Sequence, residues 1–152
     1  MEISEEEQSY TDFDWFCVDK SGNIGHFASA GFKSLPRSVI CSAEDLALLK
    51  IFFKGLPAMS SGHFLDSNLE PEKRTERQTR SFVDMADRGL FSFDIESYLR
   101  LGVPYFRVAL PIAPLRLEAL PVRIREILCR TVLNDRLLLD SPLIPYQETL
   151  EI

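Results

Sequence analysis

The side chains with the strongest potential for chemistry lie close together near the N-terminus. Asp12, Asp14, Asp19 and His26 combine three carboxylates with an imidazole in one short stretch. Such groups can bind a divalent metal or transfer protons. The Asp-x-Asp-x-Asp-Gly spacing of a calcium loop is absent, and Asp19 also suits the first position of a turn. These residues define one hypothesis: a small enzyme or ligand-binding domain that uses His26 with Asp14 or Asp19.

In that hypothesis, Trp15, His26 and Phe27 line the pocket. Two other arrangements suggest a nucleophile: Cys17 facing His26, and His63 in a Ser-Ser-Gly-His loop. No Gly-x-Ser-x-Gly elbow, third orienting residue or glycine-rich phosphate loop accompanies either. The sequence therefore predicts no catalytic residue, metal site or cofactor, and favours a function without turnover.

A basic stripe defines a second alternative, which is nucleic-acid binding. Its residues recur at spacings of three and four, as on one side of a helix: Lys73, Arg74, Arg77 and Arg80. Such a stripe could contact phosphates. Glu70, Glu72 and Glu76 interleave with it, however. Ion pairing along a solvated helix is the simpler interpretation, so nucleic acid is the less favoured partner.

The element that must position the N-terminal side chains is a β-hairpin, expected over residues 12–32. Trp15–Val18 is a continuous apolar run, which is typical of a strand covered on both faces. Asp19–Gly22 reads as a turn, because Asp can bond the backbone two residues on and Gly accepts a positive φ. Ile24–Phe27 is the expected return strand.

The later elements follow from caps, periodicity and glycine or proline stops. Ser42 caps a predicted helix that ends near Gly55 and is apolar enough to be largely buried against the hairpin. The other expectations are a helix over 70–88, strands at 90–94 and 105–110, a strand extension at 115–117, a helix from Pro121, a last strand at 136–139 and a tail. This order predicts a single-domain α+β fold with a mostly antiparallel sheet, opened by the hairpin and packed by two or three helices.

Composition narrows the class of protein. The length of 152 residues fits one domain over 1–152, and a hydrophobic content of 45% excludes disorder for most of it. No apolar run is long enough to span a membrane, and the acidic N-terminus is not a secretory signal. Cys17, Cys41 and Cys129 are odd in number and widely spaced, which indicates free thiols and a cytoplasmic location.

Charge indicates where a partner would bind. The net charge is −6, and the chain from Glu2 to Asp19 carries carboxylates but no lysine or arginine before the first basic residue, Lys20. Residues 1–10 are expected to be flexible, because nothing there is expected to be buried. An acidic start disfavours nucleic acid and attracts a basic protein surface. The predicted partner-binding residues are Glu5, Glu6, Glu7, Asp12 and Asp14.

The run Asp14–Pro36, DWFCVDKSGNIGHFASAGFKSLP, resembles the opening of cytoplasmic immunity proteins that accompany bacterial polymorphic toxins. Those openings share a Trp-Phe strand, an Asp-x-x-Gly turn and a His-Phe return strand. The similarity continues at Gly89–Phe91 and Tyr105–Pro111. The resemblance implies a protein that blocks a toxin by occlusion, without turnover, and it carries over no contact residue. The expected partner is therefore a basic toxin domain; the sequence specifies neither its identity nor the oligomeric state.

Overall fold

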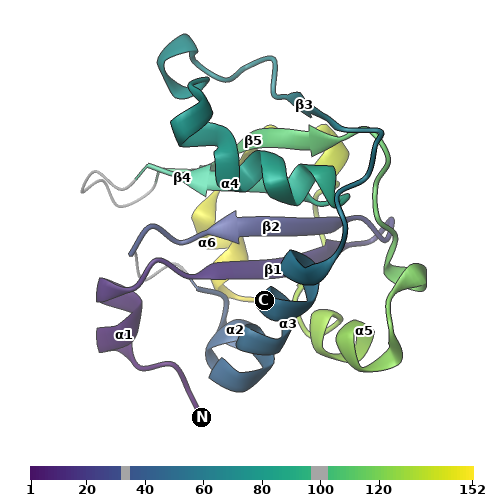
Figure 1. Ribbon diagram of the computed structural model, residues 1–152. Coiled ribbons are helices and arrows are strands. Elements are labelled where there is room, and N and C mark those ends of the chain that lie inside the picture. Colours follow the sequence, from purple (N-terminus) through teal and green to yellow (C-terminus); the bar gives the residue numbers. More distant parts are fainter. Residues whose placement is uncertain (32–34, 97–102) are drawn as a thin grey trace.

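One mixed sheet organises the chain in the computed structural model, which describes residues 1–31, 35–96 and 103–152 (Figure 1). Within these ranges the strands are β1 (Asp14–Asp19), β2 (Ile24–Ala28), β3 (His63–Leu65), β4 (Phe91–Ile95), β5 (Tyr105–Pro111), β6 (Val132–Leu133) and β7 (Leu143–Ile144). Their order is β3-β5-β4-β2-β1-β6, and β7 also pairs with β5. Only the β1–β6 and β2–β4 pairs are parallel among the described strands. The prediction of an α+β fold with a mostly antiparallel sheet is confirmed.

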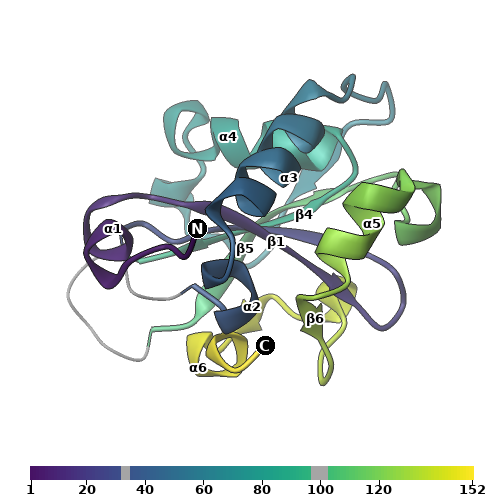
Figure 2. The same cartoon turned by 90° about the horizontal axis from the view of Figure 1, so that it is seen from below.

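Helices cover both faces of this sheet. The helices of the described ranges are α1 (Glu5–Tyr10), α2 (Arg37–Ile40), α3 (Ala43–Gly55), α4 (Glu76–Asp87), α5 (Val122–Leu128) and α6 (Tyr146–Leu150). Figure 2 shows α3 and α4 on one side of the sheet and the C-terminal segment with α6 on the other. A sheet enclosed in this way buries both sides of its central strands, which explains the continuous apolar run in β1.

The hairpin forms as the sequence predicts. The Asp19 Oδ1 atom accepts hydrogen bonds from the backbone nitrogens of Ser21 (2.9 Å) and Asn23 (3.1 Å). Gly22 takes a φ of 87°, which a residue with a Cβ rarely adopts. The last residue expected in the hairpin, Phe32, lies outside the described residues, as do positions 33 and 34 of the run that resembles immunity proteins.

The rings of the hairpin alternate between the two layers of the core. Phe16 faces α3, where its ring lies 4.8 Å from that of Phe53. On the other face, Trp15 stacks on Phe27 at 4.3 Å, and Phe27 stacks on Phe93 at 4.6 Å. The indole nitrogen of Trp15 donates a hydrogen bond to the hydroxyl of Tyr105 (3.2 Å), so the polar atom of the largest buried side chain is satisfied.

Helix α3 begins where the sequence predicts but is less buried than expected. The Ser42 hydroxyl accepts a hydrogen bond from the backbone nitrogen of Asp45 (3.1 Å), as an N-cap should. The buried face consists of Leu46, Leu49 and Phe53. Ile51 is 71% exposed, because one side of the helix faces solvent.

The N-terminus corrects the prediction that nothing in residues 1–10 is buried. Ser4 caps α1 and forms a capping box with Glu7. Ile3 is buried in the core, and its backbone nitrogen donates to the carbonyl of Ile40 (2.9 Å). A single apolar residue among carboxylates has no periodicity, so the sequence gives no sign of this anchor.

The structure departs from the sequence expectations at five later places. The helix expected over 70–88 is divided into a 3₁₀ turn (Pro71–Lys73) and α4, because extended Thr75 caps a new helix start. Within the strand extension expected at 115–117, Arg116 forms an isolated antiparallel bridge with Asn23, and a 3₁₀ turn follows at Leu117–Ala119. The strand expected at 136–139 is replaced by a 3₁₀ turn at Leu138–Asp140. β3 lies between the first two predicted helices, where no strand is expected, and the expected tail contains β7 and α6.

Candidate functional site

His26 joins β2 to both neighbouring strands through its two ring nitrogens. Its Nδ1 is hydrogen bonded to Ser92 Oγ on β4 (2.6 Å), and its Nε2 to Asp14 Oδ1 on β1 (2.8 Å). The other carboxylate oxygen of Asp14 lies 3.1 Å from Lys50 Nζ and 3.7 Å from Lys54 Nζ, both on α3. The predicted pairing of His26 with Asp14 therefore occurs, and Ser92 is an addition that the sequence analysis missed.

This Ser–His–Asp chain is not arranged for nucleophilic attack. In a catalytic triad the serine bonds Nε2 and the carboxylate bonds Nδ1, whereas here the two partners are exchanged. Ser92 is fully buried and His26 is 1% exposed, so a substrate carbonyl cannot reach the hydroxyl. The chain instead satisfies polar groups inside the sheet, as burial requires.

The charge of Asp14 is stabilised in this setting. Burial opposes ionisation, but the hydrogen bond and charge of His26 and the Lys50 ammonium outweigh it and hold the pKa of Asp14 well below its usual range. The interaction therefore stabilises the fold above the usual carboxyl pKa and is lost only as the pH falls into strong acid.

The pocket expected around Trp15, His26 and Phe27 is filled by side chains. All three residues are buried. The ring of Tyr105 packs against Trp15 and Phe27, and the ring of Phe93 packs against Phe27. Asp19 lies at the far end of β1, where its Oδ2 accepts a hydrogen bond from the Leu138 nitrogen (2.8 Å). Asp14 meets His26, but Asp19 does not.

Carboxylates gather at the end of the sheet where β1 begins and β4 ends. Figures 1 and 2 both show α1 at this end. We call it the acidic end and define it by Glu5, Glu6, Glu7, Asp12, Asp94 and Glu96. Asp12 Oδ1 accepts a hydrogen bond from the Ala30 nitrogen (2.7 Å), and Glu7 is engaged with Ser4. The charge of Asp14 is balanced within the chain, because His26 and two lysines surround its carboxylate.

The pKa of Asp94 is raised by its position at the acidic end. Burial raises the pKa of Asp94 to about 6, and the charges of Asp12 and Glu96 add to this effect. The Ile95 backbone nitrogen and Lys73 act in the opposite direction. Ionising this carboxylate near neutral pH therefore costs free energy, which an approaching cation would offset.

The basic stripe is largely committed to contacts within the chain. The Arg74 guanidinium donates to the carbonyls of Leu69 (2.9 Å) and Asp66 (2.8 Å). Arg80 pairs with Glu76 at 3.2 Å, as the spacing predicts. His63, expected in an exposed loop, is half-buried on β3 with its Nδ1 2.8 Å from Asp87 Oδ1.

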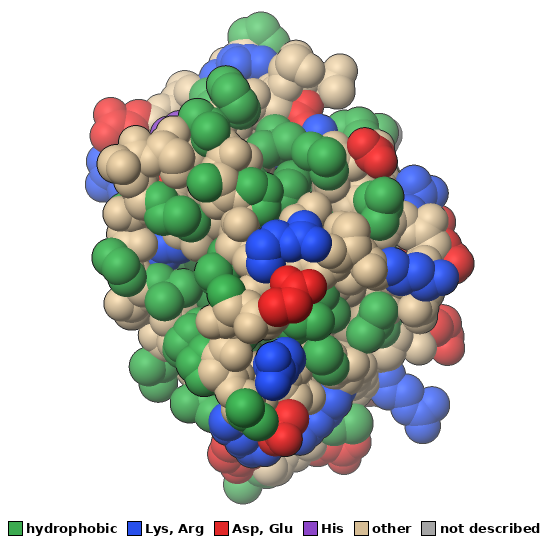
Figure 3. All heavy atoms as spheres, turned by 90° about the vertical axis from the view of Figure 1, so that its right-hand side faces the viewer, with side chains coloured by type: hydrophobic (Ala, Val, Ile, Leu, Met, Phe, Trp, Pro, Cys, Tyr) green, Lys and Arg blue, Asp and Glu red, His purple; other side chains and the backbone are tan. Residues whose placement is uncertain are grey.

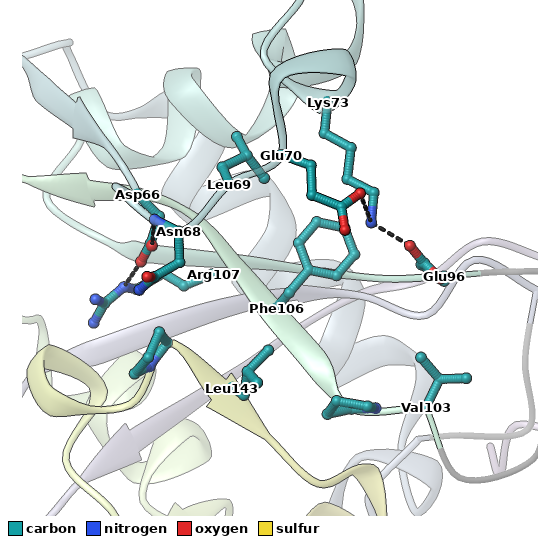
Figure 4. Close-up of a pocket in the computed structure, with 12 residues that line it drawn as sticks. Asp66, Asn68, Leu69, Glu70, Lys73, Glu96, Val103, Phe106, Arg107 and Leu143 are labelled. Atoms are coloured by element: carbon teal, nitrogen blue, oxygen red, sulfur yellow. Dashed lines mark hydrogen bonds and ion pairs between the residues drawn. The ribbon is translucent and has the colours of Figure 1, made fainter.

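A cleft lies beside β5 on the described surface. It has a volume of about 540 Å³, within the range of ligand sites. We call it the Phe106 cleft, after the ring in the middle of Figure 4. Its lining residues are Asp66, Asn68, Leu69, Glu70, Lys73, Glu96, Val103, Pro104, Phe106, Arg107, Pro142 and Leu143. A second hollow of about 340 Å³ shares Lys73, Glu96 and Phe106 with it and adds Asp94.

The two ends of the cleft carry different charge arrangements. At one end Arg107 Nε lies 2.7 Å from Asp66 Oδ2 in a buried ion pair, and Arg107 also donates to the Leu138 and Leu139 carbonyls. At the other end Lys73 pairs with Glu96, as Figure 4 shows. The Lys73 ammonium also lies 4.4 Å from the centre of the Phe106 ring, which is cation–π geometry.

No residue pattern in the sequence identifies the cleft as a site. Phe106 and Arg107 appeared as alternating strand residues, and Lys73 as part of a helical stripe. The cleft forms only when β5, β7 and the segment after β3 meet, so no local spacing reveals it. The one visible signal is Arg107, a charged residue inside a strand that is otherwise apolar.

Comparisons with protein families, with curated proteins and with solved structures found no match to this chain. The class assignment is therefore that of the fold: a single α+β domain with a mixed sheet. In the described ranges, no helix has both the length and the apolar character to cross a bilayer.

Proposed function

We propose that this chain is a cytoplasmic protein-binding domain that acts without turnover, and that its partner is a bacterial toxin. It would neutralise the toxin by covering a basic active site. The observation that carries the proposal is the gathering of carboxylates from α1, the start of β1 and the end of β4 at the acidic end. The resemblance of residues 14–36 to immunity proteins supports the choice of a toxin as partner.

Electrostatics gives the acidic end a role in recognition. Exposed carboxylates on α1 would attract a basic surface over several ångströms and raise the association rate. The raised pKa of Asp94, caused by burial and by neighbouring negative charge, also supports attraction of a basic partner. A cation arriving beside Asp94 would relieve a repulsion that already exists in the free protein.

The opposite end of the molecule has a different character. Figure 3 shows hydrophobic side chains spread over this face, with basic and acidic side chains beside one another. Arg116 and Glu118 form a pair there at 3.9 Å. This mixture of charges gives no comparable attraction for a basic partner, so it serves as the control surface.

Co-expression with a candidate toxin domain encoded beside its gene tests the proposal. The chain should restore bacterial growth and form a complex with the purified toxin domain. The Glu5→Lys/Glu6→Lys variant should slow association about tenfold at low salt, with a smaller loss at high salt.

Glu118→Lys/Glu126→Lys is the matched control, because it also reverses two exposed carboxylates, one on the turn before α5 and one on α5, away from the acidic end. It should leave the association rate within twofold of wild type. Equal effects of the two charge reversals would refute the acidic end as the binding surface. The absence of growth rescue by the wild-type chain would refute the proposed function.

A further inference from the structure

The Phe106 cleft combines apolar walls with a carboxylate rim. Leu69, Val103 and Leu143 line it, and Glu70 and Glu96 lie around the Phe106 ring (Figure 4). An apolar space that ends in negative charge suits a long side chain with an apolar stem and a cationic head. Lysine and arginine have this construction.

The protein already seats one such cation there. The Lys73 ammonium lies over the Phe106 ring, contacts Glu96 and lies 3.7 Å from Glu70 Oε2. Lys73 reaches this position from the 3₁₀ turn at the rim, and its side chain is 24% exposed. The ring and the carboxylates therefore form a cation-binding arrangement that is occupied by a lysine of the same chain.

One internal cation does not balance the charge of this region. The cleft and the hollow beside it are lined by four carboxylates, Asp66, Glu70, Asp94 and Glu96, and by two cationic side chains, Lys73 and Arg107. Arg107 is already paired with Asp66 and donates hydrogen bonds to two backbone carbonyls. Three carboxylates therefore share Lys73, and the net negative charge that remains favours a cationic side chain over a neutral one in this region.

We propose that the Phe106 cleft binds a basic side chain of the protein partner, with its stem against Leu69 and Leu143 and its head between Glu70 and Glu96. The incoming head takes the place of the Lys73 ammonium over Phe106, and Lys73 moves toward solvent. This inference rests on the proposed function, because the basic side chain would belong to the partner that binds at the acidic end.

A titration of the isotope-labelled full chain with N-acetyl-arginine methylamide, followed by amide NMR at pH 7.5, tests the site directly. The matched probe is N-acetyl-citrulline methylamide, which has the same shape without the charge. The arginine probe should shift the amides of Phe106, Glu96 and Leu143 in a saturable way. The citrulline probe should bind at least tenfold more weakly. Equal shifts from both probes, or shifts confined to α1, would overturn the proposal.

Variants show whether Lys73 competes with the incoming cation or has only a structural role. Lys73→Met should bind the arginine probe roughly two- to fivefold more tightly, which is the strength of a partly exposed ion pair. Lys20→Met removes the same charge at the opposite end of β1 and should leave the affinity unchanged. Phe106→Leu keeps an apolar floor but loses the ring, so it should weaken binding. Unchanged or weaker binding by Lys73→Met would refute the competition.

The amide spectrum of each variant shows whether it is folded, and a folded variant gives a decisive result. The outcome also separates this inference from the proposed function. A toxin complex that depends on Glu5 and Glu6 but tolerates Phe106→Leu would sink the cleft proposal and leave the function intact. If the cleft binds the arginine probe but the chain forms no complex with a toxin, the proposed function is refuted and the cation site in the cleft stands.

Discussion

Replacing Asp94 by asparagine should stabilise the protein at alkaline pH and have little effect in acid. Asparagine keeps an oxygen that can accept the hydrogen bond from the Ile95 nitrogen, which is 2.8 Å in the wild-type chain, but it removes the charge. Burial, Asp12 and Glu96 raise the pKa of the wild-type carboxyl to about 6. An unperturbed aspartate titrates at about 3.9.

The sign follows from proton binding. Between pH 4 and pH 6 the folded chain holds a proton on Asp94 that the unfolded chain releases, so the free energy of unfolding falls as the pH rises. A difference of about two pH units corresponds to about 3 kcal/mol, which is an upper bound because Asp94 retains some contact with water. We expect Asp94→Asn to be more stable than wild type by about 1–3 kcal/mol at pH 8, and equal to it near pH 4.

Urea unfolding at a series of pH values measures this difference. Asp84→Asn removes one negative charge from the exposed side of α4 and controls for net charge, so it should show no such trend. A carbon-detected NMR titration of Asp94 should give a midpoint near pH 6. The reasoning fails if the midpoint lies below about 4.5, or if Asp94→Asn is no more stable than wild type at pH 8.

Two further predictions concern the core. His26→Leu should cost about 2–4 kcal/mol in urea unfolding, because it strands the Ser92 hydroxyl and removes a charged hydrogen bond. Adding Ser92→Ala should recover about 1 kcal/mol of that cost, whereas simple additivity would contradict the coupling. Gly89→Ala should lower the free energy of unfolding by at least about 1 kcal/mol, because its Cβ would lie 2.5 Å from the Leu115 nitrogen at a φ of +96°. Gly55→Ala, whose Cβ would meet nothing within 4 Å, should cost nothing, and equal losses in both glycine variants would refute the steric argument.

The parts of the fold that the sequence predicts are those with local signals. The turn after β1 needs Asp19 and Gly22 only three residues apart, and the start of α3 needs only the Ser42 hydroxyl and a nearby backbone nitrogen. Such contacts depend on the chain within a few residues, so composition and spacing reveal them.

The parts that the sequence does not predict depend on distant partners. Ser92 meets His26 across 66 residues, and Arg107 meets Asp66 across 41. No spacing rule covers such distances, and a serine within a strand has no distinguishing feature until its neighbour is known. The exposed side of α3 shows the opposite error, because apolar residues such as Ile51 need not be buried.

The pairing of β1 also has a consequence for synthesis on the ribosome. β2 follows β1 at once, but the strand on its other side is β6, where Val18 pairs with Val132. A nascent or prematurely ended chain shorter than about 130 residues therefore leaves Val18 and Asp19, the two residues that β6 pairs, with an uncapped edge at the end of an apolar strand, which is a template for aggregation. Translation products that stop before β6 should need chaperones or be degraded, whereas chains that extend beyond it can close the sheet themselves.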